Sequence, residues 1–553
     1  MKIRIEDNII YSPYPSSEVP VCSFYTLARE RLLVDPDKIA LFSDVISLTR
    51  AEALAGMERY AVGFRQHGVL SGDRMCIHLD NTVENLLAMY GCVLAGATIV
   101  LAKTSLTEGE IRYHAGDGDC THIITDEQYA VKVKAAVASL NIKALFCMGR
   151  AMGFVSASDF LKLDEQDFRE CAIADPRSTV LAVCYTSGTT GMPKGAEITH
   201  YNLVAGYYMM RGHGCDCSAQ CTSLRRGNLP WDEGDIFFGT LPITHVSGMA
   251  FVMAALLDGT CCAIVSAKLT PAEILDTVDK YKSTAALFFP CQLQDIVREM
   301  RRTGRGMSSM RRIAVGGSVV SPSTAEAAWK SFSGLNLLLN VYGLTESCGI
   351  ITCQPKTGEP QTTADVGVPL PGVQIKVVDV NSRQKLSAHQ TGEICFRTFS
   401  MVRGYYKRPK ETAELFDEEG WCLSGDAGYY DDDGRLYIFD RLKQMIKCMD
   451  KQVVPVELED LLLRQHVDEI AEVCVVGLPH SDYGEAPAAA VVLTENGCMQ
   501  ELPTLAERIK DTVASNLAVY KHLYGGVYFV DSFPKTETGK VNRTALARSL
   551  LSV

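Results

Sequence analysis

A run of hydroxyl-bearing and glycine residues is the part of the chain best suited to chemistry. It follows an apolar stretch at residues 180–185 and ends near a lysine. Glycines allow tight turns and close backbone approach to a ligand, and successive N–H groups in such turns form an anion-binding nest. The spacing differs from the G-x-x-x-x-G-K-[ST] phosphate loop. A flexible turn is the plain alternative, but so many hydroxyls after a buried strand favour a phosphate cradle of Thr186, Ser187, Gly188, Thr189, Thr190, Gly191 and Lys194.

Residues 185–195 closely resemble the signature loop of the adenylate-forming superfamily, which includes acyl-CoA synthetases, coumarate-CoA ligases, peptide-synthetase adenylation domains and beetle luciferases. The resemblance covers nearly the whole chain, and the later motifs match in order and spacing. It implies that the protein activates a carboxylic acid with ATP and Mg²⁺. The acyl-adenylate would then pass its acyl group to coenzyme A.

The resemblance assigns the nucleotide's base and phosphates to residues 340–347. There Tyr342 would stack on adenine beside Gly343, Thr345 would contact the α-phosphate, and Glu346 would bind Mg²⁺. A flat aromatic ring suits a purine face, and a carboxylate suits a hard cation. A strand and turn with an incidental acid is the plain alternative.

Two further segments complete the nucleotide site that the resemblance implies. Asp426 would accept hydrogen bonds from both ribose hydroxyls, which suits an acceptor-only carboxylate. Arg441 would reach the ribose or the phosphates, and Gly317 and Ser318 would form a loop on the adenine side. The pattern around Gly317 and Ser318 is the weakest of these, since a glycine turn is common.

The acyl pocket that the resemblance implies contains His245, Gly248 and Val341. The histidine would contact the substrate carboxylate. A lone histidine beside an apolar helix is usually a core or capping residue, but this one lies between two matched motifs. Many relatives have glycine in place of Val341, so we expect a narrower or shorter pocket.

The C-terminal matches supply a mobile lysine. Lys540 resembles the family's catalytic lysine, and with Lys194 and His245 it forms the expected catalytic set. Lys443 corresponds to the hinge about which the C-terminal domain rotates between half-reactions. Lys447 and Asp450 would lie on the CoA side, where an aspartate replaces the family's usual glycine and puts the thiol step in question.

The elements that must position these residues are predicted to be α/β. Apolar strands alternate with helical stretches over residues 25–380, which indicates βαβ units and largely parallel sheets. From about residue 372 closely spaced strands indicate an antiparallel or barrel-like section. We expect a large domain at 1–440 and a small mobile α+β domain at 441–553, with the hinge at about 443.

Composition excludes several function classes. A formal net charge of −12 disfavours general binding to nucleic acid. The uncharged stretch at 86–102 is too short and too interrupted for a membrane span, and a buried helix followed by a strand is expected. Twenty cysteines, mostly single in apolar runs, indicate reduced thiols and a cytoplasmic location. The C-terminus lacks the Ser-Lys-Leu peroxisomal address.

The sequence is compatible with three functions. The leading one is an acyl- or aryl-CoA ligase, for which fatty, cinnamic and short-chain acids are candidate substrates. The second is an adenylating enzyme with another acceptor or luciferase-like oxygenation, and the third is an inactive nucleotide-binding scaffold. The insert around Cys215, Cys217 and Cys221 is expected to be a solvent loop, because its spacing does not suit zinc.

Overall fold

The computed structural model describes residues 3–16, 18–186, 192–211, 231, 234–320, 322–356, 365–449, 451–535 and 540–551. Five expected phosphate-loop residues lie outside this range: Ser187, Gly188, Thr189, Thr190 and Gly191. Asp450 and the three cysteines of the insert also lie outside it. The remaining predicted site residues are described.

A largely parallel seven-stranded sheet carries the phosphate loop. Its strand order is β11 (Lys194–Thr199), β10 (Val180–Thr186), β6 (Thr98–Leu101), β5 (Arg74–His78), β7 (His122–Asp126), β8 (Ala144–Met148) and β9 (Val155–Ser156). Its helices include α2 (Arg50–Gln66), α3 (Val83–Leu94), α4 (Glu108–Asp117) and α5 (Ala130–Ala136). The expected helix and strand within residues 86–102 are therefore confirmed as α3 and β6.

A nine-stranded sheet carries the adenine and acyl motifs. Its order is β18 (Val368–Pro369), β17 (Gly349–Cys353), β16 (Leu337–Leu344), β15 (Arg312–Gly316), β14 (Ala285–Phe288), β12 (Ile236–Gly239), β13 (Cys261–Ile264), β3 (Ile39–Phe42) and β4 (Ser47–Thr49). The six strands from β16 to β3 are parallel to one another, whereas β17 and β4 pair antiparallel with the outer two. The helices of this region include α8 (Pro271–Tyr281), α9 (Pro290–Thr303) and α10 (Pro322–Ser331).

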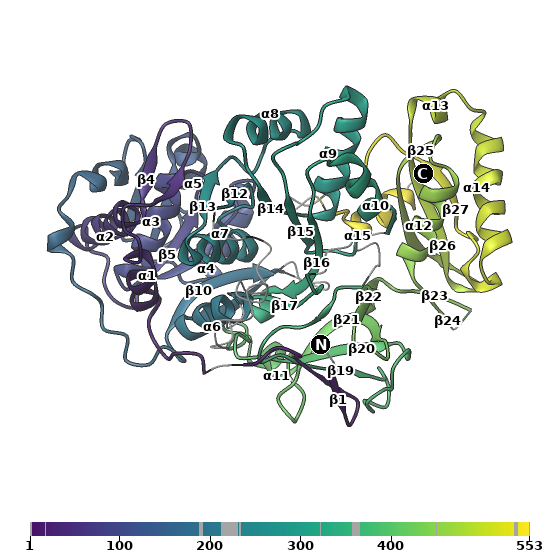
Figure 1. Cartoon of the computed structure of the whole chain (residues 1–553), viewed down its shortest axis with the longest axis horizontal. Coiled ribbons are helices and arrows are strands. Elements are labelled where there is room, and N and C mark those ends of the chain that lie inside the picture. The colour runs from purple at the N-terminus through teal and green to yellow at the C-terminus, as the bar shows by residue number, and fades with distance from the viewer. Residues whose placement is uncertain are drawn as a thin grey trace.

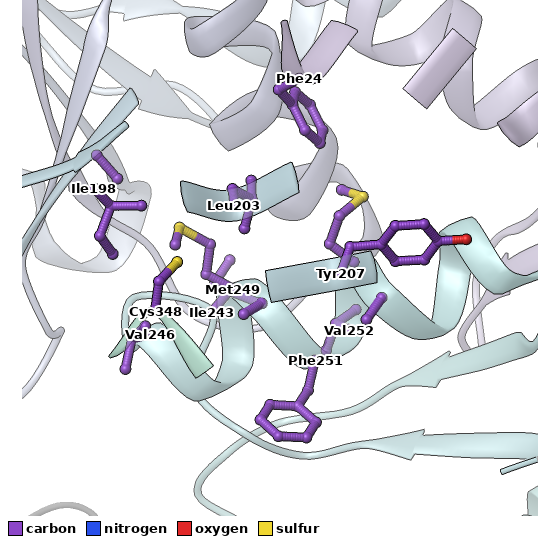
Figure 2. Close-up of a cluster of buried hydrophobic side chains, with 14 of the residues drawn as sticks. Phe24, Ile198, Leu203, Tyr207, Ile243, Val246, Met249, Phe251, Val252 and Cys348 are labelled. Carbon is purple, nitrogen blue, oxygen red and sulfur yellow. The ribbon is translucent and has the colours of Figure 1, made fainter. Parts of the chain in front are cut away.

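Three apolar helices pack together beside the nine-stranded sheet. They are α1 (Phe24–Leu32), α6 (His200–Arg211) and α7 (Val246–Asp258). Helix α7 is apolar nearly all round and buried along almost its whole length. Figure 2 shows side chains of this core, with Phe24, Leu203 and Met249 among those labelled. Because α7 is so deeply buried, it holds the residue at its N-terminus in a fixed position.

A six-stranded antiparallel sheet follows, as expected from the change of texture near residue 372. Its order is β1 (Arg4–Glu6), β2 (Ile9–Tyr11), β19 (Gln374–Val378), β20 (Gly392–Arg397), β21 (Cys422–Tyr430) and β22 (Leu436–Arg441). Figure 1 shows the purple N-terminal strands beside the green strands of this sheet. The N-terminal hairpin thus completes a sheet formed mainly by residues more than 360 positions later.

The C-terminal elements form a smaller α+β unit, at the right of Figure 1. Its strands are β24 (Lys451–Val453), β23 (Ile446–Cys448), β26 (Gly484–Leu493), β25 (Ile470–His480) and β27 (Gly526–Phe529). Its main helices are α12 (Pro455–Gln465), α14 (Leu502–Asn516) and α15 (Arg543–Leu550). Its hydrophobic clusters contain only residues from 446 onward, whereas the clusters of the larger part stop before 440. The α/β prediction, with a large N-terminal part and a small C-terminal one, is confirmed.

Candidate active site

Several predicted site residues lie at or just after the carboxyl ends of two strands, β10 and β16. Strand β10 runs parallel to β6 and ends at Thr186, where the phosphate loop begins. Strand β16 runs parallel to β15 and ends at Leu344, just before Thr345 and Glu346. The carboxyl ends of parallel strands are the usual location of ligand sites in such sheets.

Asp426 lies at the centre of the nucleotide side and is buried. The Tyr342 hydroxyl donates to one carboxylate oxygen at 2.6 Å, and Arg441 Nε pairs with the other at 2.9 Å. Asp426 and Arg441 are direct partners across β21 and β22, so the sheet itself sets this ion pair. Arg441 also donates to the Ser424 carbonyl at 2.9 Å. The remaining carboxylate lone pairs can accept hydroxyl donors, as a ribose would require.

Burial raises the pKa of Asp426, and the nearby Arg441 and Lys540 oppose that rise. The carboxylate of Asp426 in turn raises the pKa of Arg441 above its usual value. Burial also raises the pKa of Tyr342 well above its ordinary value, so its hydroxyl remains a donor. The three groups form one preorganised polar unit.

Glu346 is held by Tyr405, a residue that the sequence analysis missed. The Tyr405 hydroxyl donates to Glu346 Oε1 at 2.6 Å, and the Lys194 ammonium lies 5.3 Å from the centre of the Tyr405 ring. Tyr405 therefore joins the predicted metal carboxylate to the predicted phosphate lysine. No spacing rule in the sequence points to this tyrosine, because the link exists only after β11 and the 402–405 segment come together.

The metal-ligating side chains are sparse. Among the described residues, no group of three or more His, Cys, Asp and Glu side chains could hold a metal ion. Mg²⁺ commonly uses one or two carboxylates together with substrate phosphates and water. Among the described residues, only Tyr405 donates to the Glu346 carboxylate, which fits that kind of binding and not a closed protein cage.

His245 caps the N-terminus of α7, and the cap fixes its ring. The Ser247 backbone N–H donates to His245 Nδ1 at 3.2 Å, and the Ser247 hydroxyl lies 2.6 Å from the same nitrogen. Because an N–H can only donate, Nδ1 is an acceptor and the ring proton lies on Nε2. Burial, together with the charges of Lys103 and Lys540, lowers the pKa of His245 to about 3. The ring is thus a neutral hydrogen-bond donor through Nε2.

Glycines let neighbouring groups approach where the resemblance places the acyl and adenine pockets. A Cβ on Gly248 would lie 1.9 Å from the Pro242 carbonyl oxygen, and one on Gly343 would lie 2.1 Å from the Gly349 oxygen. The Phe289 ring covers Gly317, which has a φ of +90°, and meets the His245 ring edge-on at 6.2 Å. These positions admit no larger residue without movement.

Val341 and Ser318 differ in their surroundings. Val341 is buried, and its side chain would lie 2.6 Å from a Cβ on Gly316. Its bulk therefore fills space between β15 and β16. Ser318 is exposed on the loop after Gly317.

Lys540 lies beside the polar unit although it belongs to the C-terminal part. The residue is exposed to solvent. Desolvation by neighbouring protein atoms, together with the positive charges of Arg441 and Lys103, lowers the pKa of its ammonium to about 8, while Asp426 opposes the shift. The structure thus brings Lys540 together with Asp426, Arg441 and His245.

Lys103 is a second residue that the sequence analysis missed. It follows β6, next to the strand that leads into the phosphate loop, and its charge acts on both His245 and Lys540. Its strand gave no motif in the sequence. The site therefore holds more positive charge than the motifs alone predicted.

Two predicted lysines lie apart from this cluster. Lys443 is exposed in a short turn, Leu442–Gln444, and Lys447 is exposed on β23 with its backbone N–H donating to Glu485 at 2.7 Å. Among the described residues, neither ammonium has a hydrogen bond or ion pair. Their proposed hinge and CoA-side roles remain predictions.

The chain matches two family models. One is the AMP-binding enzyme family, over residues 29–406, and the other is the AMP-binding enzyme C-terminal domain, over residues 457–540. Among curated proteins it is 30% identical to 4-coumarate–CoA ligase 1 of Petroselinum crispum over 99% of this chain and 98% of that protein. It is also 30% identical to 4-coumarate–CoA ligase 3 of Oryza sativa subsp. japonica, over 91% and 87% respectively.

Solved structures share the fold. The ATP-bound RpMatB-BxBclM chimera B1 has a TM-score of 0.82 at 25% identity, covering 95% of this chain and 98% of that one. The anthranilate CoA ligase AuaEII in complex with anthranoyl-AMP has a TM-score of 0.83 at 21% identity, covering 97% and 98%. No helix in the described part of the chain is long and apolar enough to span a membrane.

Proposed function

Because the chain belongs to the AMP-binding, adenylate-forming enzyme family, we propose that it is an acid–thiol ligase. It forms an acyl-adenylate from a carboxylic acid and ATP, with release of pyrophosphate, and then transfers the acyl group to coenzyme A. The 4-coumarate–CoA ligases that it resembles over almost their whole length support an aryl or related acid and CoA as the acceptor.

Lys540 carries this proposal. Its ammonium comes from the far end of the chain and lies within electrostatic reach of Asp426, Arg441 and His245. The first half-reaction brings two anions together, so a site for it must concentrate positive charge. An isolated nucleotide-binding scaffold would not need a lysine beside both the ribose carboxylate and the acyl-side histidine.

The first step forms a mixed anhydride. A carboxylate oxygen attacks the α-phosphorus of ATP in line, the new P–O bond forms, and the bond to pyrophosphate breaks. Positioning and charge stabilisation dominate this kind of transfer. In this proposal Lys540 stabilises the charge that builds up between the two reactants, and Lys194 stabilises the leaving pyrophosphate.

His245 orients the acid and does not act as a base. Its Nε2–H donates to the substrate carboxylate, and its low pKa keeps the ring neutral at physiological pH. The ring does not need to gain or lose a proton during the reaction.

The base and ribose of the nucleotide would bind the preorganised unit. Tyr342 offers a ring face to adenine, and Asp426 accepts from the ribose hydroxyls while Arg441 holds it in place. Glu346, oriented by Tyr405, would hold Mg²⁺. When bound, the ion neutralises charge on the phosphate oxygens of ATP.

The second step needs the thiol of CoA. The thiolate attacks the acyl carbon, a thioester bond forms, and AMP leaves with the anhydride oxygen. Lys443 is the proposed hinge for the domain rotation that replaces Lys540 with a thiol channel near Lys447 and Asp450. Buried, free cysteines in the described part of the chain agree with a reducing, cytoplasmic-type location.

A substrate panel tests the proposal. Fatty, cinnamic and short-chain acids are supplied with ATP and Mg²⁺, and acid-dependent ATP–pyrophosphate exchange is measured with and without CoA. We expect exchange with at least one acid, and AMP release that requires CoA for sustained turnover. Exchange without CoA-dependent turnover would indicate another acceptor, and absence of exchange with every acid would contradict the proposal.

A further inference from the structure

The segment that carries His245 is a compact unit held by its own contacts. The His245 backbone N–H donates to the Pro242 carbonyl at 3.0 Å, which closes a turn. The ring is fixed on Ser247, and Gly248 packs directly against Pro242. Residues 241–248, named here the His245 segment, therefore move together. Any displacement of the segment displaces the Nε2–H that faces the acid.

The Asn81 side chain, next to the seven-stranded sheet, holds the start of this segment by two hydrogen bonds. Asn81 follows β5 of the seven-stranded sheet and is only 7% exposed. Its Nδ2 donates to the Leu241 carbonyl at 2.8 Å, and its Oδ1 accepts from the Ile243 N–H at 3.0 Å. Both backbone groups are buried, so each would otherwise lose its hydrogen bond with no water to replace it.

A second contact holds helix α7 at Met249, directly after the His245 segment. The Tyr90 hydroxyl, on α3, donates to the Met249 carbonyl at 2.8 Å. The Tyr90 ring stacks on Phe24 at 4.7 Å and is fully buried. In Figure 2, Met249 and Val246 lie on α7 below Phe24, within the same packed core. Helix α3 and the residues just before it thus hold the chain on both sides of His245.

We propose that Asn81 and Tyr90 are positioning residues that hold His245 at the distance its hydrogen bond to the acid requires. The inference rests on the proposed function, in which His245 orients the carboxylate. Neither residue needs to touch the substrate. They act through the His245 segment, and their loss should weaken use of the acid more than use of ATP.

The chemistry of the amide explains why asparagine stands at position 81. An amide can donate to one backbone group and accept from another at once, whereas a carboxylate can only accept. Asn81→Asp keeps the shape but turns an acceptor toward the Leu241 carbonyl. The segment must then shift or leave a buried acceptor unpaired. A misplacement of about 1 Å in a reacting group can cost about a hundredfold in rate.

Asn85 provides a matched control. It lies on α3, is also buried, and its Nδ2 donates to the Asp80 carbonyl at 2.9 Å and to Asp126 at 2.7 Å. It has no hydrogen bond to the His245 segment. Asn81→Ala and Asn85→Ala therefore remove the same amide from the same region with different consequences for His245.

The test measures pyrophosphate exchange for Asn81→Asp, Asn81→Ala, Tyr90→Phe and Asn85→Ala, each also in a His245→Ala background. We expect KM for the acid to rise about tenfold or more in both Asn81 variants and less in Tyr90→Phe, with KM for ATP within about twofold. In the His245→Ala background the same changes should have almost no further effect. Equal losses in Asn81→Ala and Asn85→Ala, or full additivity with His245→Ala, would overturn the inference.

A structural readout separates this inference from the proposed function. The imidazole ¹⁵N resonances of His245, identified by their loss in His245→Ala, report the Nε2–H tautomer without any substrate. We expect Asn81→Asp and Tyr90→Phe to shift these resonances and Asn85→Ala to leave them in place. Unmoved resonances in all variants would overturn the positioning role. If the wild-type protein shows no exchange with any acid, the proposed function fails and this readout still decides the inference. Should an Asn81 variant not fold, Tyr90→Phe carries the same test with the loss of one hydroxyl.

Discussion

The two sides of the candidate site are built in different ways. Around Asp426, an ion pair within the six-stranded sheet and a short hydrogen bond from Tyr342 of the nine-stranded sheet fix the groups before any ligand binds. Lys540, by contrast, reaches the site from another unit of the chain, and desolvation together with its positively charged neighbours lowers the pKa of its ammonium. In the proposed function the Asp426 side is therefore a preorganised binding surface, whereas Lys540 is a catalytic group that the C-terminal unit brings to the site and withdraws.

Several described contacts between the two units are polar. Arg298 on α9 pairs with Glu472 at 3.7 Å and donates to the Ala471 carbonyl at 3.3 Å. Arg543 lies 3.8 Å from Asp440. No hydrophobic cluster of described residues spans both units. Polar interfaces between domains commonly permit relative domain motion.

Removing the catalytic group should have the largest effect. Lys540→Ala should slow adenylation by about a hundredfold or more, because loss of one preorganised charge typically costs about 2.7–4 kcal/mol. ATP binding should change little, since the Asp426 unit remains. Pyrophosphate exchange and equilibrium nucleotide binding measure the two effects. An unchanged exchange rate would remove Lys540 from the mechanism.

Breaking the rigid side should give a smaller effect of a different kind. Asp426→Asn should raise KM for ATP by roughly ten- to a hundredfold, since hydrogen bonds to a charged group are worth about 1.5–3 kcal/mol. The wild-type protein should prefer ATP to 2′-deoxy-ATP, and the variant should lose that preference. Retention of the full preference would show that the ribose binds elsewhere.

Stiffening the proposed hinge should separate the half-reactions. Lys443→Pro restricts the backbone at residues 442 and 443, and we expect acyl-CoA formation to fall roughly tenfold more than pyrophosphate exchange. Lys443→Ala, which keeps backbone freedom, is the control. Equal losses in both half-reactions would count against a hinge here.

The rate should also depend on pH through Lys540. Because the pKa of its ammonium is lowered to about 8, the catalytic charge is present below that pH and is lost as pH rises through it. We expect kcat/KM for adenylation to fall above pH 8. Lys540→Arg, which stays charged, should lack this alkaline limb even if its rate is lower. The same limb in that variant would assign it to another group.

Weakening the interface should have the smallest effect. Arg298→Ala removes a partly exposed ion pair, a class worth about 0–1 kcal/mol, so the balance between the two half-reactions should shift by less than about fivefold. Arg302→Ala, whose partner Glu299 lies on the same helix, is the control for general surface charge. A large loss of adenylation in Arg298→Ala alone would mean that the interface is not easily released.

Much of the fold could be predicted from local pattern. The alternation of apolar strands with helices predicted the parallel sheets, and the change of texture near residue 372 predicted the antiparallel one. The pairing of β2 with β19 could not be predicted, because it joins residues 9–11 to 374–376 and no local signal connects them. Pairings so distant in sequence depend on the assembled surface.

The residues of the candidate site likewise fall into two groups: those that motifs predicted and those that only the folded structure shows. Tyr342, Asp426, Arg441 and Lys540 lie in motifs with recognisable order, and the structure brings them together. Tyr405, Lys103 and Asn81 act only through contacts made after folding, so residue type and spacing give no signal for them. Their partners come from separate elements, such as Glu346 for Tyr405 and Leu241 for Asn81.

The most direct test of the account supplies Lys540→Ala with a preformed acyl-adenylate and CoA. Acyl-CoA formation is then compared with that of the wild-type protein, alongside adenylate formation from acid and ATP. We predict a near-wild-type rate of thioester formation in the variant together with its severe loss of adenylation. Equal impairment of both half-reactions would contradict a lysine that serves the first step and withdraws for the second.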